Sequence, residues 1–269
     1  MFLDLSLQIT AIYVLTGMFA GVVGGMLGLG GGIIIVPVLH FVFLQQGFPS
    51  SVLMHLAVTT SLATIIVTSL SATYTHHKKS VVLWPVVNRL APGIVIGAGL
   101  GALLADSLSS NILRVAFGFF EILVALQIWF ELKPKAQVAL PETQGLICSG
   151  TGIGFFSTLL GIGGGTLTVP FLLWCNVNMR NAVAVSSACG FPIAVAGTSA
   201  LIIAGWSNSA LPVNAISYLY WPAALIIIAM TVFFAPLGAR LAHYLPVQTL
   251  KRFFSILLLI VGARMLFNA

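Results

Sequence analysis

The sequence predicts an all-α integral membrane protein, built from two inverted repeats of about five helical segments each, with Gly-rich broken or re-entrant helices in each half. Hydrophobic residues make up 59% of the 269-residue chain and charged residues only 6%, whereas a soluble domain carries about 25% charged residues. The mean hydropathy is +1.11. The apolar blocks approach or pass the roughly 20 residues that a membrane-spanning helix needs, and the pattern of blocks occurs twice.

The net charge of +6 does not indicate a nucleic-acid partner. The basic residues stand mostly between or at the ends of apolar blocks, where they orient helices in a membrane. The start of the chain contains Asp4 and no Lys or Arg, so we expect the first apolar block to be retained rather than cleaved as a signal peptide. Cys148, Cys175 and Cys189 lack metal-ligand spacing, and no metal, cofactor or disulfide framework is expected.

An internal duplication organises the chain. Residues 27–37 read LGLGGGIIIVP and residues 160–170 read LGIGGGTLTVP, while residues 97–130 align without gaps to residues 234–267. Matching blocks in the same order indicate a repeat. The expected units are a first membrane repeat, a cytoplasmic linker and a second membrane repeat, at 1–132, 133–144 and 145–269.

Each half divides into five apolar segments, which should be helical because a helix satisfies its own backbone hydrogen bonds in lipid. The block 8–45 would form about 57 Å of helix, which is too long for one crossing. We therefore expect broken or re-entrant helix pairs whose Gly-rich tips, at 28–32 and 161–165, reach toward the middle of the bilayer. The expected segments are 8–27, 33–45, 51–74, 83–105, 111–132, 145–160, 166–176, 181–204, 216–238 and 249–267.

Basic residues change sides between the halves. Loop 75–82 contains two Lys and two His residues, whereas its repeat partner 205–215 is uncharged. Conversely, the turn 106–110 has no Lys or Arg, and its partner region around 240–252 contains three. Membrane proteins carry an excess of Lys and Arg on the cytoplasmic side. The change of sides therefore predicts that the two halves are inverted, with both termini outside. The expected location is the cell inner (plasma) membrane, as a multi-pass protein. The expected cytoplasmic loops are 75–82, 133–144, 177–180 and 240–251.

The two Gly-rich breaks are the strongest candidates for a substrate site. Glycine allows φ above zero and leaves its N–H group unshielded, and a helix that restarts after a break has unpaired N–H groups that suit an anion. Paired breaks in inverted halves point to the substrate site of a transporter. The alternative is close helix packing, which the four-residue spacing of Gly93, Gly97 and Gly101 favours for that segment. The candidate glycines are Gly28, Gly30, Gly31, Gly32, Gly161, Gly163, Gly164 and Gly165.

A cluster of hydroxyl groups follows each Gly-rich break at corresponding positions. Residues 57–61 read AVTTS and residues 184–188 read AVSSA. Hydroxyls inside apolar helices can donate hydrogen bonds to an anion without carrying charge. They can equally bond to the preceding helical turn or to a neighbouring helix. The candidates are Thr59, Thr60, Ser61, Ser186, Ser187 and the neighbouring Cys189.

Two charged residues fall inside expected helices. Glu121 lies midway along 111–132, where a carboxyl group is costly and is a functional candidate by default. It could hold a coupled proton, or be a neutral acid in a helix contact. Arg89 lies near the expected cytoplasmic end of 83–105. It could attract an anion, although extension of its side chain to the membrane surface is the favoured interpretation.

The two Gly-rich motifs, each followed four residues on by Val-Pro, resemble the sulfite exporter TauE/SafE family, also called the 4-toluene sulfonate uptake permease family. The resemblance covers nearly the whole chain, including the duplication. It implies an integral inner-membrane protein that transports a small sulfur-containing anion, such as sulfite, thiosulfate, sulfoacetate or a related sulfonate. The matching positions are Gly28, Gly30, Gly31, Gly32 and Pro37, with Gly161, Gly163, Gly164, Gly165 and Pro170.

The leading functional prediction is an anion transporter that works by alternating access between its inverted repeats. A passive anion channel is the alternative. An enzyme is not expected, because the chain has no HExxH motif, no GxSxG motif and no intramembrane Asp pair. The expected partners are the lipid bilayer and the small anion. A coupled proton and a homo-oligomer stay open.

Overall fold

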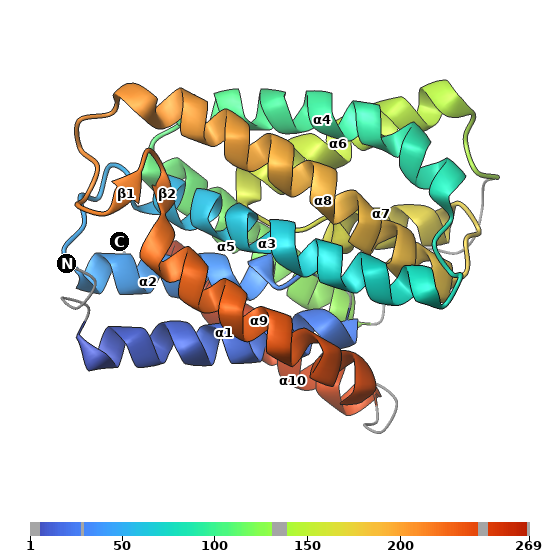
Figure 1. The fold of residues 1–269 in the computed structure, drawn as a ribbon, viewed down its shortest axis with the longest axis horizontal. Helices are drawn as coiled ribbons and strands as arrows, with labels where there is room; N and C mark the ends of the chain where they lie inside the picture. The colour runs from blue at the N-terminus through green and yellow to red at the C-terminus, as the bar shows by residue number, and fades with distance from the viewer. Residues whose placement is uncertain (1–5, 28–29, 131–138, 242–246, 268–269) are drawn as a thin grey trace.

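The computed structural model describes residues 6–27, 30–130, 139–241 and 247–267, most of which are helical. In this described part the chain forms ten α-helices, which Figure 1 shows in sequence order. The first five are α1 Leu7–Leu27, α2 Gly32–Gln45, α3 Leu53–Lys78, α4 Trp84–Ser107 and α5 Ser110–Trp129. The second five are α6 Thr143–Leu160, α7 Gly165–Trp174, α8 Met179–Ala204, α9 Trp221–Leu241 and α10 Val247–Phe267.

Within the described residues, six helices are long and apolar enough to cross a membrane: α1, α3, α4, α5, α8 and α9. Helices α2 and α7 are shorter, with 14 and 10 residues. Apolar helices of this number and length confirm the predicted all-α membrane class.

The chain reverses direction at each Gly-rich break. In Figure 1, α1 runs from the left toward the right and α2 returns to the left, while α6 and α7 make the corresponding turn from the right. The backbone of Gly30, Gly31 and Gly161 has φ of 73°, 79° and 68°, a left-handed conformation that glycine adopts without strain. The broken helix pairs that the sequence predicts are therefore present.

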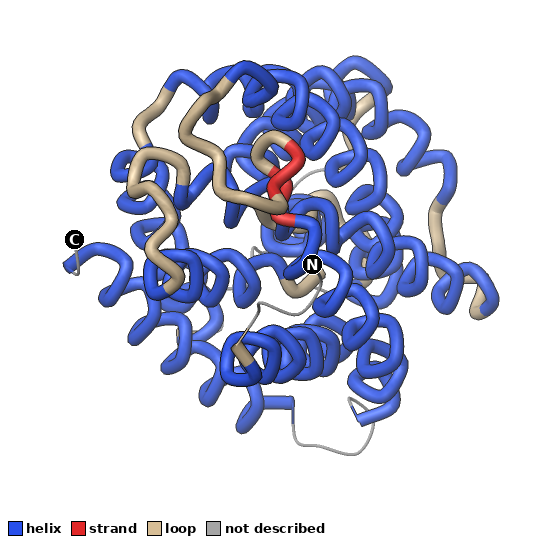
Figure 2. Tube along the Cα trace, turned by 60° about the vertical axis from the view of Figure 1, so that its left-hand side comes forward, coloured by secondary structure: helices blue, strands red, loops and turns tan. Residues whose placement is uncertain are grey.

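The helix expected at 216–238 begins later than predicted. Residues Ala215–Ile216 (β1) and Leu219–Tyr220 (β2) pair as an antiparallel hairpin, red in Figure 2, before α9 starts. Asn214 and Ser217 have φ of 68° and 53°, and residues in this left-handed region cannot continue a right-handed helix. The apolar composition of this segment gave no indication of the β1–β2 hairpin.

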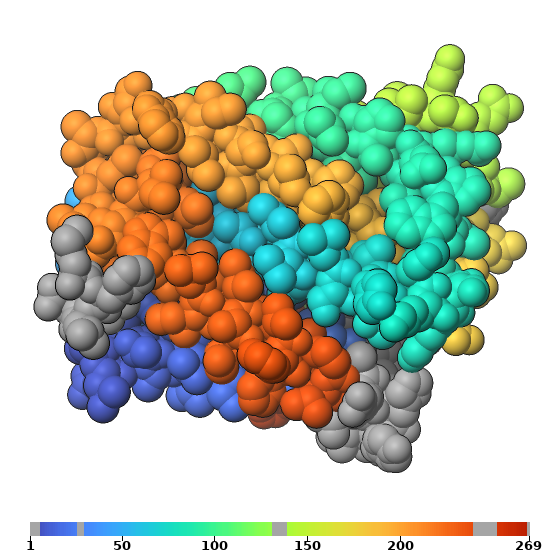
Figure 3. Space-filling model, in the orientation of Figure 1, coloured from blue at the N-terminus to red at the C-terminus, as the bar shows by residue number. Residues whose placement is uncertain are grey.

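Helices α3 and α8 pack against each other at the centre. Of the 18-residue apolar stretch of α3, 83% is buried, against 33% for the corresponding stretches of α1 and α9. Figure 3 shows α3 as a narrow band between α8 and α9. The other main packed pairs are α4 with α6, α1 with α9, α5 with α10, α4 with α8 and α3 with α9. Exchanging each helix for its counterpart in the other half reproduces this set of pairs.

Glycine lets two of these pairs approach very closely. A Cβ atom added to Gly97 would lie 2.0 Å from the carbonyl oxygen of Thr151 on α6, and one added to Gly25 would lie 2.2 Å from that of Ala235 on α9. Gly93 and Gly101 meet α6 in the same way, so the predicted helix contact of these glycines is confirmed. The α4–α6 and α1–α9 pairs therefore form tightly packed outer walls around α3 and α8.

Candidate functional site

The two Gly-rich stretches meet in the interior of the protein. A Cβ atom added to Gly32 would lie 2.7 Å from the carbonyl oxygen of Gly161, and one added to Gly30 would lie 3.4 Å from the Cα atom of Gly163. Side chains at these positions would push the stretches apart. The sequence predicted that both stretches reach toward the middle of the bilayer; Gly28, one of the candidate glycines, lies outside the described residues.

Helix α7 begins at this meeting point with unpaired donors. The N–H groups of Leu167 and Thr168 donate to the carbonyl oxygen of Gly164, at 3.3 Å and 2.7 Å. No side chain caps the helix, and the N–H groups of Gly165 and Thr166 donate to no backbone carbonyl of the described residues. Unpaired N–H groups at the positive end of a helix can bind an anion.

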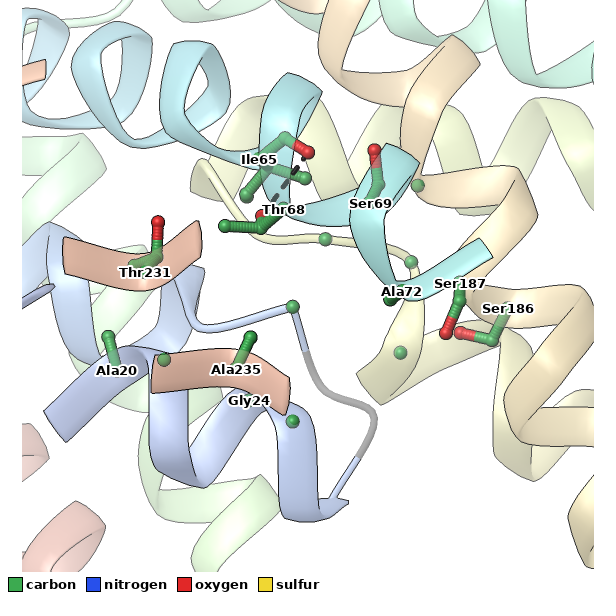
Figure 4. A pocket seen from close by; sticks show the side chains of 17 residues that line it. Ala20, Gly24, Ile65, Thr68, Ser69, Ala72, Ser186, Ser187, Thr231 and Ala235 are labelled. Carbon is green, nitrogen blue, oxygen red and sulfur yellow. Dashed lines mark hydrogen bonds between the residues drawn. The ribbon is translucent and has the colours of Figure 1, made fainter. Parts of the chain in front are cut away.

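A cavity lies beside the start of α7 and is shown in Figure 4. About 510 Å³ of space lies between the atoms here, a volume that includes open solvent. Four of the candidate glycines line it, namely Gly30, Gly163, Gly164 and Gly165. Small residues of α1 and α9, such as Ala20, Gly24 and Ala235, form the opposite wall. Every lining residue is uncharged.

Hydroxyl groups from α3, α8 and α9 also line the cavity. Ser186 is 1% exposed, and its Oγ has no hydrogen-bond partner among the described residues. The other hydroxyls already donate to carbonyl oxygens of their own helices: Ser187 to Val183, Thr68 to Thr64, Ser69 to Ile66 and Thr231 to Ile228. Ser186 is therefore the hydroxyl that can donate to a ligand without breaking a bond.

Three of these hydroxyl residues, Thr68, Ser69 and Thr231, were not singled out from the sequence. A signal was present for Thr68, because residues at helical spacing lie on one face and Ser61, Thr64 and Thr68 continue in that pattern along α3. The match between the halves covers residues 57–61 and 184–188, whereas Thr68 has Val195 as its counterpart.

The hydroxyl candidates of the first half lie outside the cavity lining. Ser61 Oγ donates to the carbonyl oxygen of Gly161 at 2.8 Å, so that α3 holds the second Gly-rich stretch. Thr60 Oγ1 accepts a hydrogen bond from the N–H of Tyr220 at 3.0 Å. Thr59 is fully buried, and its hydroxyl has no partner in the described part of the chain. Cys189, on α8, is buried next to Gly190 of the lining.

Neither charged candidate lines the cavity. Glu121 is fully buried on α5, where a Cβ atom added to Gly262 of α10 would lie 3.1 Å from its own Cβ. Neither carboxyl oxygen has a hydrogen-bond partner among the described residues. Arg89 is exposed on α4. Glu121 therefore lies in a helix contact, and Arg89 lies on the outside of the helix bundle.

An aromatic cluster packs at the end of the molecule where the hairpin lies. Phe43 and Phe48 stack with ring centroids 5.2 Å apart, and Tyr220 meets their edges at 5.3 Å and 5.2 Å. Beside the cluster, Gln46 Nε2 donates to Tyr13 Oη at 2.6 Å. These contacts join α1, α2 and the hairpin, and we call them the hairpin-end seal.

The hairpin itself is held by Tyr218, whose hydroxyl donates to Asp106 Oδ1 at 2.8 Å and accepts from Asn208 Nδ2 at 3.1 Å. Burial raises the pKa of the Tyr218 phenol, which keeps it protonated as a donor to the carboxylate. The Tyr218 ring also stacks on His55 of α3 with centroids 4.9 Å apart. The hairpin is thus bonded to both halves of the chain.

Comparisons with known proteins agree with this architecture. The family described as "Sulfite exporter TauE/SafE" matches residues 13–265. A relative from Haemophilus influenzae, named a probable membrane transporter protein, is 35% identical over 93% of this chain and 96% of its own length. The probable membrane transporter protein YunE of Bacillus subtilis is 30% identical over 96% of this chain and 97% of its own length. No solved structure matches significantly.

Proposed function

Because the chain belongs to the sulfite exporter TauE/SafE family of membrane transporters, we propose that it carries a small sulfur-containing anion across a cell inner membrane by alternating access. Sulfite, thiosulfate, sulfoacetate and related sulfonates are the candidate substrates. The observation that carries the proposal is the cavity at the start of α7, where unpaired N–H groups and the free Ser186 hydroxyl meet without any charged lining residue.

This combination of groups suits an oxyanion that must be released again. Each N–H or O–H donor offers a hydrogen bond to an anionic oxygen, worth about 1.5–3 kcal/mol when one partner is charged. A full positive charge in the cavity would add strong Coulomb attraction at low dielectric and would slow release. The oxygen atoms of the anion bind to the N–H groups of Gly165 and Thr166 and to the hydroxyl of Ser186, and the small apolar residues of α1 and α9 enclose the remainder.

Inversion of the two halves supports alternating access. In Figure 1, α3 and α9 run from left to right, whereas their repeat counterparts α8 and α4 run from right to left. Loops at the right end include 79–83, with Lys79, and those at the left include 46–52, with no charge. The positive-inside tendency makes the right end cytoplasmic and the hairpin end external, with both termini outside.

The cavity and the hairpin-end seal then define an inward-facing state. The cavity-lining residues of α3, from Ile65 to Ala72, and those of α8, from Ser186 to Gly190, belong to the cytoplasmic halves of these helices. The seal of Phe43, Phe48 and Tyr220 closes the external side. A site closed on one side favours a carrier over a passive channel, because a channel needs a continuous path.

Flux into proteoliposomes tests the proposal. We expect purified protein to move labelled sulfite, thiosulfate or a short sulfonate with saturable kinetics, and external unlabelled substrate to accelerate exit of the label. The serine variant Ser186→Ala should lower the affinity. Absence of flux for every sulfur anion would refute the substrate class, while single-channel currents without counter-exchange would establish the channel alternative.

A further inference from the structure

A basic cluster lies where α3 ends and α8 begins. Lys79 follows α3, and Arg180 stands in the first turn of α8. Both carry charges that act on the ring of His76, in the last turn of α3. The cluster therefore joins residues from the first and second repeats at the end of the molecule that the proposed orientation assigns to the cytoplasm.

The cluster lies on the cavity side of both helices. On α3, Ser69 and Ala72 line the cavity, and His76 follows them at i+7 and i+4, on the same helical face. On α8, Ser187 lines the cavity and bonds to Val183, and Arg180 precedes them at i−7 and i−3. Seven residues correspond to about 10 Å along a helix. On both α3 and α8, one helix face therefore runs from the basic cluster to the cavity.

Their positive charges are not neutralised by neighbours. Lys79 and Arg180 are exposed, and the described residues form no ion pair with either. Lys78 differs, because its Nζ lies over the ring of Tyr74 at 4.5 Å and it follows Ser69 by nine residues, which places it on the opposite face of α3.

We propose that Lys79 and Arg180, together with His76, form an entry site that gathers the small sulfur oxyanion from the cytoplasm and delivers it to the neutral cavity. The entry site rests on the proposed transport function. Long-range attraction here raises the local anion concentration and leaves the binding cavity itself free of charge. The anion is thus captured at the entry site and released from the neutral cavity, two places along one path.

Coulomb attraction sets the size of the expected effect. Two unit charges about 10 Å from a monovalent anion, at the dielectric constant of water, change its local concentration by about fourfold. A divalent anion should respond more strongly. Ions in solution screen this attraction, since the Debye length falls from roughly 30 Å at 0.01 M to roughly 3 Å at 1 M salt.

The test measures sulfite transport from the cytoplasmic face at low and high concentrations of sodium gluconate, whose bulky anion is chosen so as not to compete for the cavity. We expect the Lys79→Gln/Arg180→Gln double variant to raise KM about fourfold at low salt, with kcat unchanged. At high salt the variant and the wild-type protein should converge. Lys78→Gln removes the charge at the last residue of α3, on its opposite face, and its KM should rise much less.

Several results would overturn the entry site. One is a KM of the wild-type protein that does not change with salt. This measurement can be made even if the double variant does not fold. Another is an equal rise of KM in Lys78→Gln, which would assign the effect to the overall positive charge at this end of the molecule. A wild-type protein that moves no sulfur anion would instead refute the proposed function, so the two failures are distinguishable.

Discussion

The two Gly-rich stretches share their sequence and lie against each other, yet their surroundings differ. Beside the second stretch, Gly163, Gly164 and Gly165 all line the cavity, and Ser186 faces it with an unpartnered hydroxyl. Of the described residues of the first stretch, the cavity lining includes Gly30 alone. Thr59, the repeat counterpart of Ser186, is buried outside the lining.

This difference indicates how a duplicated chain can work as a switch. The N-terminal end of α7 faces the cavity, whereas Gly32, at the N-terminal end of α2, is buried against Gly161 and Ile65 and does not line it. Under the proposed mechanism, an exchange of the roles of the two halves would give a second state that is open at the hairpin end. Alternating access then requires only that the two environments change places, and the following experiments test that idea.

Blocking the open side should have the largest effect. In Gly164→Val the new side chain meets Ile193 Cδ1 and Thr168 Oγ1, both about 3 Å from its Cβ atom, and it shields the N–H groups at the start of α7. Loss of two hydrogen bonds to an anion lowers affinity roughly 100-fold or more. Sulfite flux into proteoliposomes measures this loss. Gly99→Val is the control, because nothing lies within 4 Å of its Cβ position.

The repeat-related hydroxyls should differ when substrate is supplied from the cytoplasm. Ser186→Ala removes a free donor from the cavity, and the half-saturation concentration should rise about tenfold. Thr59→Ala should raise it much less, because Thr59 lies outside the lining. The measurement is initial uptake into vesicles of known orientation. Equal effects of the two substitutions would contradict the difference between the two regions.

Weakening the hairpin-end seal should shift the balance between the two states. Thr60→Val removes the acceptor for the Tyr220 N–H group, and one such hydrogen bond contributes about 1 kcal/mol, or about fivefold in population. A cysteine placed at Thr59, with Cys148 replaced by Ser, reports the opening. An impermeant thiol reagent added outside should label it about fivefold faster in the Thr60→Val background. An unchanged rate would mean that the hairpin does not control the external side.

Much of this arrangement could be predicted from the sequence. The repeated LGxGGG motif predicted two breaks at matching positions, and Gly32 does lie against Gly161. Apolar block lengths predicted the helices, because the bilayer fixes the length of a spanning segment. The motif could not separate the roles of the neighbouring hydroxyls. Ser61 bonds to a carbonyl oxygen and Ser186 stays free, a difference that depends on which backbone atoms the other half brings near.

The remaining features depend on packing between distant segments. The hairpin at residues 215–220 contains Ser217, a left-handed residue inside the expected helix 216–238, and follows Asn214, a left-handed residue just before it. Arg89 was a candidate because of its depth in an apolar segment, whereas its exposure depends on α4 having its neighbours on the other face. The hydropathy profile locates the ends of a helix and so shows how deep in it a residue lies. It does not show which face of the helix the residue occupies.

Glu121 provides the test with the smallest expected effect on substrate affinity. Its carboxyl group lies between α5 and α10, away from the cavity lining, so Glu121→Gln should leave the KM for sulfite unchanged. If a proton couples to transport through this carboxyl, the variant loses the stimulation that a pH gradient gives to the wild-type protein. Flux with and without the gradient measures both quantities in one preparation. Normal stimulation in the variant would exclude Glu121 as the coupling site, and a raised KM would show that the α5–α10 pair controls the cavity between the repeats.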